Sequence, residues 1–181
     1  MGDTADDVQE DPVTAPTAPT LTAERADLLE TLAAHRYFLR VTVRGLTTEQ
    51  ATRRTTASEL TLAGIVKHVA ATEASWADFV VRGTAALEQS PEEWGEQWAL
   101  RPGETLESVL EHYDGVAART DELVRTVDLG TAHPLPEAPW FAPGAVRSAR
   151  RVFLHVVAET AQHAGHADIL RESLDGQRTM G

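Results

Sequence analysis

Residues 148–174 read SARRVFLHVVAETAQHAGHADILRESL, and this stretch decides the fold. It predicts one long helix that starts near Ser148 and ends near Leu174, with Gly176 as the stop signal. Four side chains that can bind metals recur in it at intervals of four, four and three residues, which places them along one stripe of a helix: His155, Glu159, His163 and His166. Carboxylates and imidazoles that face a bundle core cost free energy unless they are paired. A bound metal ion would offset that cost, and a hydrogen-bonded polar seam is the alternative interpretation.

The pair Glu159 and His163 predicts a metal site. One helical turn separates the two residues, so a carboxylate oxygen and an imidazole nitrogen can bind the same ion. His68 lies about ninety residues earlier, in another helical stretch, and supplies a third ligand from a facing helix. Three protein ligands leave one coordination position open, which is typical of catalytic metal sites. Two nitrogens and one oxygen suit Zn²⁺, and Ni²⁺ or Fe²⁺ are also compatible.

Two common metal motifs are absent from the sequence. There is no His-Glu-x-x-His segment, which argues against a zinc protease. No histidine has a glutamate three residues before it, so the paired Glu-x-x-His pattern of di-iron bundles is also missing. The sequence therefore predicts one mononuclear site.

The rest of the chain predicts three more helices and no strand. Apolar residues at helical spacing place them at about residues 22–44, from Ser58 or Thr61 to Arg82, and at about residues 105–127. Four helices of this length predict an all-α fold, a four-helix bundle that spans residues 21–176.

Long connections join the later helices, over residues 84–104 and 128–147. Loops of this length inside a compact domain are usually functional or mobile. Their aromatic side chains are expected either to wall the mouth of a pocket or to anchor the loops in the core: Trp94, Trp98, Trp140 and Phe141.

Several polar residues outside the metal triad have more than one interpretation. His166 is a candidate fourth ligand, a support for the ligands, or a proton shuttle. His155 is expected to support the ligands or to pack in the core, and His35, on the apolar stripe of the first helix, to border the site or to pack. His112 and His133 are expected at the surface or in a loop. Arg150 and Arg151 are expected either to be solvated at the start of a helix or to bind an anionic substrate group.

Composition narrows the classes of function. The 181 residues are 42% hydrophobic and 24% charged, which is typical of a soluble globular protein, and no apolar run approaches the ~20 residues of a membrane span. The net charge of −12 disfavours nucleic acid and anionic membranes as partners. The chain has no cysteine, so thiol chemistry would need a thiol from outside. Residues 1–20 predict an acidic, proline-rich tail that is disordered or loosely docked and is not a signal peptide, so a cytoplasmic protein is expected; residues 177–181 are expected to form a C-terminal tail.

From Leu21 to Gly176 the chain resembles the DinB-like superfamily. The resemblance rests on His68 after Ala-Gly-Ile-Val-Lys and on Glu159-x-x-x-His163-Ala-Gly-His166-Ala-Asp168. Many members have three histidines, whereas Glu159 at the middle position resembles the branch that includes mycothiol-dependent maleylpyruvate isomerase and the mycothiol S-transferases. The segments LTAERADLL and TVRGLT look most like the short actinobacterial S-transferase type.

This resemblance implies a function as well as a fold. It implies that His68, Glu159 and His163 bind a metal ion, usually zinc, and that the protein conjugates mycothiol to electrophilic small molecules in detoxification. The isomerase has an additional C-terminal domain, and this chain ends soon after the fourth helix, so the S-transferase is favoured. His166 is expected to help remove the thiol proton. The alternatives are a non-catalytic metal- or thiol-binding stress protein and a metal-dependent hydrolase; a homodimer is compatible with the apolar bundle faces.

Overall fold

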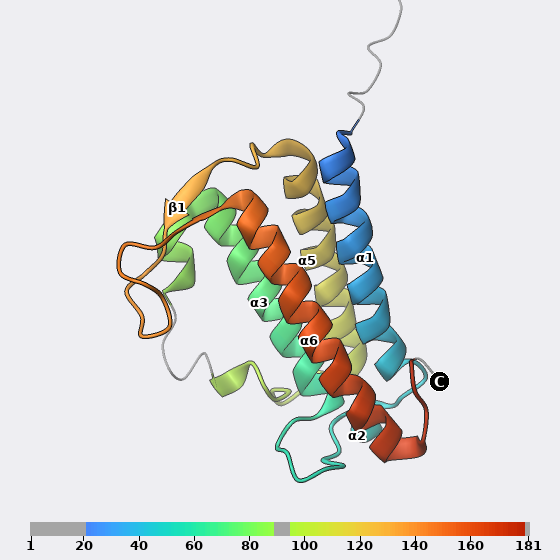
Figure 1. The fold of residues 1–181 in the computed structure, drawn as a ribbon. Helices are drawn as coiled ribbons and strands as arrows, with labels where there is room; N and C mark the ends of the chain where they lie inside the picture. Colours follow the sequence, from blue (N-terminus) through green and yellow to red (C-terminus); the bar gives the residue numbers. More distant parts are fainter. Residues whose placement is uncertain (1–20, 89–94, 180–181) are drawn as a thin grey trace, which may run out of the picture.

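Four long helices lie side by side in the computed structural model, which describes residues 21–88 and 95–179 (Figure 1). They are α1 (Ala23–Val43), α3 (Leu62–Arg82), α5 (Leu106–Thr126) and α6 (Ala149–Asp175). The predicted all-α four-helix bundle is therefore confirmed. The predicted tail over residues 1–20, the last two residues of the chain and Trp94 lie outside the described residues.

The directions of the helices explain the long connections. In Figure 1, α1 and α6 run from the top of the view to the bottom, whereas α3 and α5 run upward. Because α3 and α5 point the same way, the chain between them must return along the length of the bundle. Crossover connections of this kind are a known variant of bundle topology. The connection between Arg82 and Leu106, of which the structure describes residues 83–88 and 95–105, joins these two ends.

Local capping signals set the helix boundaries. The hydroxyls of Thr22, Thr61, Thr105 and Ser148 each accept a hydrogen bond from the backbone N–H three residues later. Thr61, rather than Ser58, therefore begins α3. Gly176 ends α6 with a φ of 80°, a left-handed conformation that glycine adopts without steric cost.

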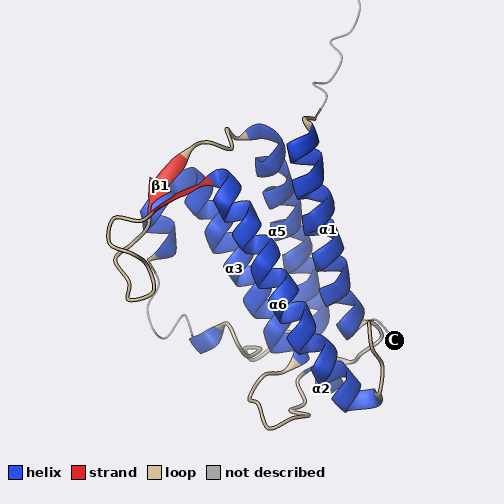
Figure 2. Cartoon of the chain, in the orientation of Figure 1, coloured by secondary structure: helices blue, strands red, loops and turns tan. Residues whose placement is uncertain are grey.

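The connections contain short elements that the sequence pattern did not predict. They include helix α2 (Thr48–Ala51), the 3₁₀ helix η1 (Gly83–Leu87), and the antiparallel strands β1 (Ala132–Pro134) and β2 (Val146–Ser148), shown in red in Figure 2. The prediction of no strand was wrong. Each strand is only three residues long, too short to show alternation, and depends on pairing across the loop, with His133 opposite Arg147.

Buried apolar residues form two clusters, one toward each end of the bundle. One cluster contains Leu39, Ile65, Val116 and Ala164, and the other contains Leu32, Trp76, Val124 and Val156. On every long helix a buried polar residue lies between the two: Arg36, Glu73, Thr120 and Thr160. The bundle therefore has a polar layer across its middle.

An ion pair occupies this layer. The Arg36 guanidinium donates from Nε to Glu73 Oε2 at 3.3 Å and from Nη1 to Asp121 Oδ1 at 2.7 Å. The Arg36 and Glu73 side chains are 7% and 1% exposed. Buried charges persist in a core only when they are paired in this way.

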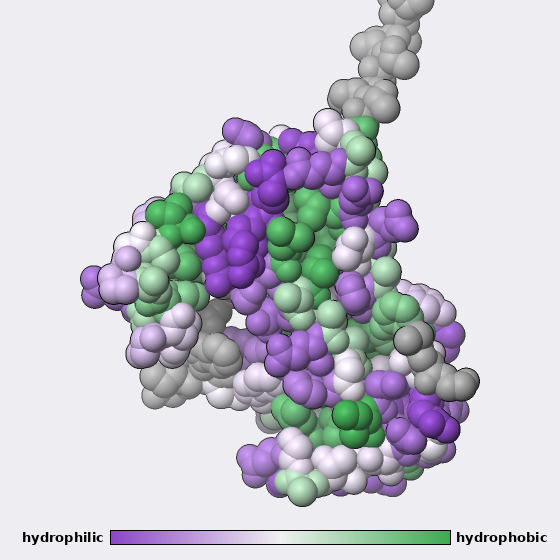
Figure 3. Space-filling view, viewed as in Figure 1, coloured by the Kyte–Doolittle hydropathy of each residue, from purple (hydrophilic) through white to green (hydrophobic). Residues whose placement is uncertain are grey.

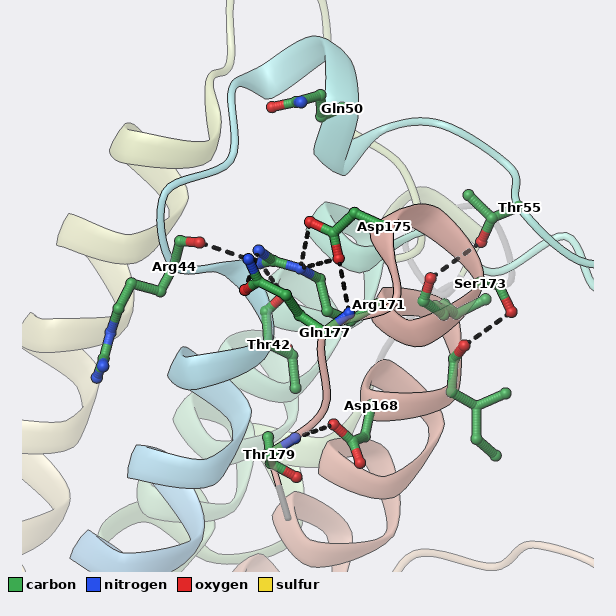
Figure 4. Close-up of polar contacts among 12 residues, drawn as sticks. Thr42, Arg44, Gln50, Thr55, Asp168, Arg171, Ser173, Asp175, Gln177 and Thr179 are labelled. Carbon is green, nitrogen blue, oxygen red and sulfur yellow. Dashed lines mark hydrogen bonds and ion pairs between the residues drawn. The ribbon is translucent and has the colours of Figure 1, made fainter. Parts of the chain in front are cut away.

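The end of the bundle farthest from the two strands is fixed by Arg171 (Figure 4). Its Nη1 donates to the backbone carbonyls of Thr42 at 2.9 Å and Arg44 at 3.0 Å, and its Nε donates to Asp175 at 3.0 Å. Its Nη2 donates to Gln177 Oε1 at 2.6 Å. One buried arginine thus joins the C-terminal end of α6 to the end of α1.

Candidate metal centre

Helices α3 and α6 pack against each other and bring the predicted ligands together. His68 comes from α3, and Glu159 and His163 come from α6. One possible ligand atom from each residue lies within 4.8 Å of the others. The two imidazoles are buried, at 3% and 7% exposure, whereas the Glu159 side chain is 28% exposed. The group is therefore enclosed by the bundle but reachable through the carboxylate.

The polar atoms of this group fit a metal ion. Glu159 Oε2 lies 3.6 Å from His163 Nε2, while the buried His163 Nδ1 has no hydrogen-bond partner. A buried nitrogen without a partner costs free energy, which metal coordination by this ring would help to offset. Burial lowers the pKa of His68 to about 4, and the nearby His163 lowers the pKa of Glu159. Neutral imidazoles and an ionised carboxylate are the protonation states that bind metals.

Trp98 covers one side of His68. The two rings stack with centroids 3.7 Å apart and planes 14° from parallel, and Trp98 also contacts His163 edge-on at 5.6 Å. The backbone at Trp98 comes so close to α3 that a Cβ on Gly64 would lie 2.2 Å from the Trp98 carbonyl oxygen. Glycine at position 64 therefore permits the approach. Trp98 was predicted to be a pocket wall or a core anchor, and here it packs on a candidate ligand.

A cavity of about 1350 Å³ opens beside these residues. His68 and Glu159 line it, together with His155 and aromatic residues of the 135–145 loop. In Figure 3 the surface is hollowed beside this loop. Two of the three candidate ligands, His68 and Glu159, therefore face a space that is large enough for a small organic molecule, since ligand pockets typically measure ~300–1,000 Å³.

His155 lies next to Glu159 in the cavity wall. Its Nε2 is 3.7 Å from Glu159 Oε1, and its ring packs edge-on against Trp76 at 4.8 Å. Burial, followed by the nearby Arg147, lowers the pKa of His155. His155 is therefore half-buried between Trp76 and a candidate ligand, and its predicted supporting role stays a prediction.

Arg147 is a cavity residue that the sequence reasoning missed. It lies in β2, directly before the N-cap of α6, and its guanidinium is 4.7 Å from the centre of the Trp76 ring and 5.3 Å from that of Phe141. Among the nearby arginines, only Arg150 and Arg151 were predicted from the sequence as candidates for binding an anionic group. Neither of these lines the cavity, and Arg150 pairs instead with Glu24 of α1, Nη2 to Oε2 at 3.2 Å.

The other candidates lie around the site or away from it. His166 is exposed, with its ring 5.4 Å from His163, and it does not line the cavity. His35 does not line the cavity either and contacts Phe38 at 6.3 Å. Three further candidates differ in their exposure. His112 is exposed, His133 is half-buried in β1, and Trp140 lines the cavity although its side chain is 71% exposed.

The family model of the mycothiol S-transferases matches residues 27–176. The chain belongs to the mycothiol S-transferase family. This match covers most of α1 and the whole of α3, α5 and α6, so it includes both helices that carry the candidate ligands. The DinB-like resemblance read from the sequence is thereby confirmed.

The fold comparison agrees with the family match. A conserved protein from Enterococcus faecalis has a similar structure, with a TM-score of 0.63 and 13% sequence identity, over 87% of this chain and 100% of that chain. At this identity the likeness shows the fold alone. No curated protein matches the sequence significantly. Within the described part of the chain, no helix of this mycothiol S-transferase family member is long and apolar enough to cross a membrane.

Proposed function

We propose that the protein is a metal-dependent thiol S-transferase that conjugates mycothiol to electrophilic small molecules, with His68, Glu159 and His163 as metal ligands. One observation carries the proposal: two imidazoles and one carboxylate converge in the bundle, and two of these three groups, His68 and Glu159, line a cavity of about 1350 Å³ in a chain of the mycothiol S-transferase family. The donor set of two nitrogens and one oxygen favours Zn²⁺.

Conjugation requires three changes in bonding. The thiol loses its proton, its sulfur electron pair forms a bond to an electrophilic carbon, and the electrophile either releases a leaving group with its bonding electrons or takes a proton on the neighbouring carbon of a double bond. A zinc ion, when bound, would take the thiol at an open coordination position and lower the thiol pKa. The protein itself has no cysteine that could compete for the electrophile.

Two histidines next to the ligands are assigned supporting roles. His155 lies in the cavity wall 3.7 Å from Glu159 and would hold this carboxylate in place. His166 is exposed beside His163, so its imidazole can exchange protons with water. We assign it the transfer of the thiol proton to solvent, because an imidazole can both accept and release a proton.

The proposal is tested by metal content and conjugation measured together. Untagged wild type should contain one equivalent of metal by elemental analysis, and His68→Ala, Glu159→Gln and His163→Ala should lose it while keeping their helical circular dichroism. Wild type loaded with zinc should form mycothiol adducts with a panel of uncharged aryl halides and Michael acceptors. His112→Ala, an exposed histidine on α5, serves as the matched control and should behave as wild type.

Each alternative function has its own result. Mycothiol binding without turnover under saturating electrophile would indicate a non-catalytic binding protein. Hydrolysis that needs no thiol and stops on chelation would indicate a hydrolase. If zinc-loaded protein gave no thiol-dependent product with any electrophile, the transferase proposal would be wrong.

A further inference from the structure

Arg147 is the one lysine or arginine among the described residues that line the cavity. Its Nη1 atom is buried and has no hydrogen-bond partner, and no described carboxylate forms an ion pair with it. The buried arginines contrast with the half-buried Arg147, because Arg36 donates to Glu73 and Asp121, and Arg171 donates to Asp175 and to backbone carbonyls. A guanidinium nitrogen that is buried without an acceptor costs free energy. An acceptor supplied by a ligand would remove this cost.

The position of Arg147 is fixed before any ligand binds. Its strand β2 pairs with β1, with His133 opposite, and the next residue, Ser148, is the N-cap of α6. Its guanidinium lies over the rings of Trp76 and Phe141, at 4.7 and 5.3 Å from their centres. Aromatic faces attract a guanidinium and leave its planar edge available for hydrogen bonds. A planar fork held in this way matches the two oxygens of a carboxylate.

The charges of the cavity favour a singly charged group. Glu88, Glu137 and Glu159 line the same space, so a doubly charged phosphate would meet three carboxylates and a single cation. A carboxylate carries one charge, which Arg147 balances. The remaining wall is largely apolar, with Leu87, Pro136, Pro139 and Trp140 beside the aromatic pair, and it suits an aryl or alkenyl group.

We propose that Arg147 binds the carboxylate of the electrophilic substrate, so that the protein prefers carboxylic acids with an aryl or alkenyl body over uncharged electrophiles. This inference rests on the proposed function, because only a transferase would use the bound acid as a substrate. The binding of a carboxylate at Arg147 does not depend on turnover. Arg147 and Glu159 line the same cavity, so a substrate held at the guanidinium lies in the space that the candidate ligands face. Arg147 thus acts as a specificity residue.

The test is a binding measurement with a matched pair of unreactive probes. Calorimetry compares trans-cinnamate with its uncharged amide, cinnamamide, on metal-free and on zinc-loaded full-length protein. Wild type should bind cinnamate about tenfold or more tightly than cinnamamide, since a charge-assisted bidentate contact is much stronger than a neutral one. Arg147→Met keeps the apolar stem and should lose the preference while binding cinnamamide as wild type does. Arg147→Lys should keep only part of it, and Arg151→Met, an exposed arginine outside the cavity, should keep all of it.

Equal affinities for the two probes in wild type, or no measurable binding of cinnamate, would overturn the inference. A preference that survives in Arg147→Met would also overturn it. If Arg147→Met did not fold, the Arg147→Lys variant would provide the test. A full preference for cinnamate over cinnamamide in Arg147→Lys would show that the bidentate guanidinium contact is not used, and this result would overturn the inference. Conjugation of uncharged electrophiles by wild type reports on the transferase proposal alone, so the two proposals can fail separately.

Discussion

Trp98 lies flat on His68, with ring centroids 3.7 Å apart and ring planes 14° from parallel. Trp98 comes from the crossover connection, whereas His68 comes from the first half of α3. The stack therefore joins the long return of the chain to a candidate metal ligand. It restricts the orientation of the imidazole, and groups that orient ligands contribute to metal affinity.

Trp98→Ala should weaken zinc binding by about 10- to 100-fold, the usual effect of losing a group that orients a ligand. Competition with a chromophoric chelator measures the affinity. Trp98→Phe should retain most of it, because a phenyl ring can still stack on the imidazole. Trp140→Ala is the matched control, since Trp140 is exposed and lies over Phe141 rather than over a ligand. Equal affinities in Trp98→Ala and Trp140→Ala would show that the stack does not support the site.

Gly64→Ala should also weaken zinc binding, although alanine is the better helix former. The new methyl group would lie 2.2 Å from the Trp98 carbonyl oxygen, so the connection must move away from α3 and take the Trp98 ring with it. Gly115→Ala in α5 meets no atom within 4 Å and should stabilise the protein by up to about 1 kcal/mol. Zinc competition and urea unfolding distinguish the two variants. Unchanged zinc affinity in Gly64→Ala would contradict the close approach.

His166→Ala should lower the turnover of conjugation by about 10²-fold, the lower end of what a general base contributes, without changing metal content. Added imidazole should restore part of the rate, because the position is exposed and a small base can take the place of the side chain. His112→Ala is again the control. A turnover equal to that of wild type would remove His166 from the mechanism and leave the proton to solvent.

The stability of metal-free protein should fall in acid because of His68. Burial lowers its pKa in the folded state to about 4, below the ordinary 6.5 of the unfolded chain. A depressed pKa gives stability that is fully present above pH 6.5 and is lost as the pH falls toward 4. The loss amounts to up to about 3 kcal/mol. Urea unfolding of wild type and His68→Gln between pH 7 and 4 measures it, and a constant difference between them over this range would contradict the prediction.

Local signals in the sequence were sufficient for the four long helices. The hydroxyl before each long helix and Gly176 after the last one act on the backbone within a few residues, so the sequence placed the helix ends to within a few residues. The spacing of Glu159 and His163 likewise places both on one face of α6, and the structure brings His68 to them. The role of these residues as ligands remains a prediction that the metal analysis tests.

Contacts between segments that are distant in the chain could not be predicted from the sequence. The ion pair between Arg36 and Glu73 joins two helices that are distant in sequence. The residues next to Arg36 in the sequence do not indicate that its side chain is buried. The apolar stripe predicted for the first helix therefore included His35. In the structure the neighbouring residue, Arg36, is buried instead, and the two positions differ by about 100° around the helix axis. Arg147 was not predicted as a cavity residue for a similar reason, since its position depends on the pairing of β1 with β2.

Glu73→Gln should destabilise the protein by about 3–5 kcal/mol, because it leaves the buried Arg36 guanidinium without its main counter-charge. Glu49→Gln breaks the exposed pair with Arg53 and should cost no more than about 1 kcal/mol. Urea unfolding measures both variants.

Replacing both partners of the buried pair, Arg36→Met with Glu73→Leu, should recover much of that loss, since a buried ion pair often contributes little compared with apolar packing. The zinc affinity of the double variant then reports on the purpose of the polar layer. If stability recovers while zinc binding falls, the layer serves to hold α1 and α3 in the register that the site needs. If the double variant is as unstable as Glu73→Gln, the ion pair is a net source of stability, and the comparison with apolar packing fails for this bundle.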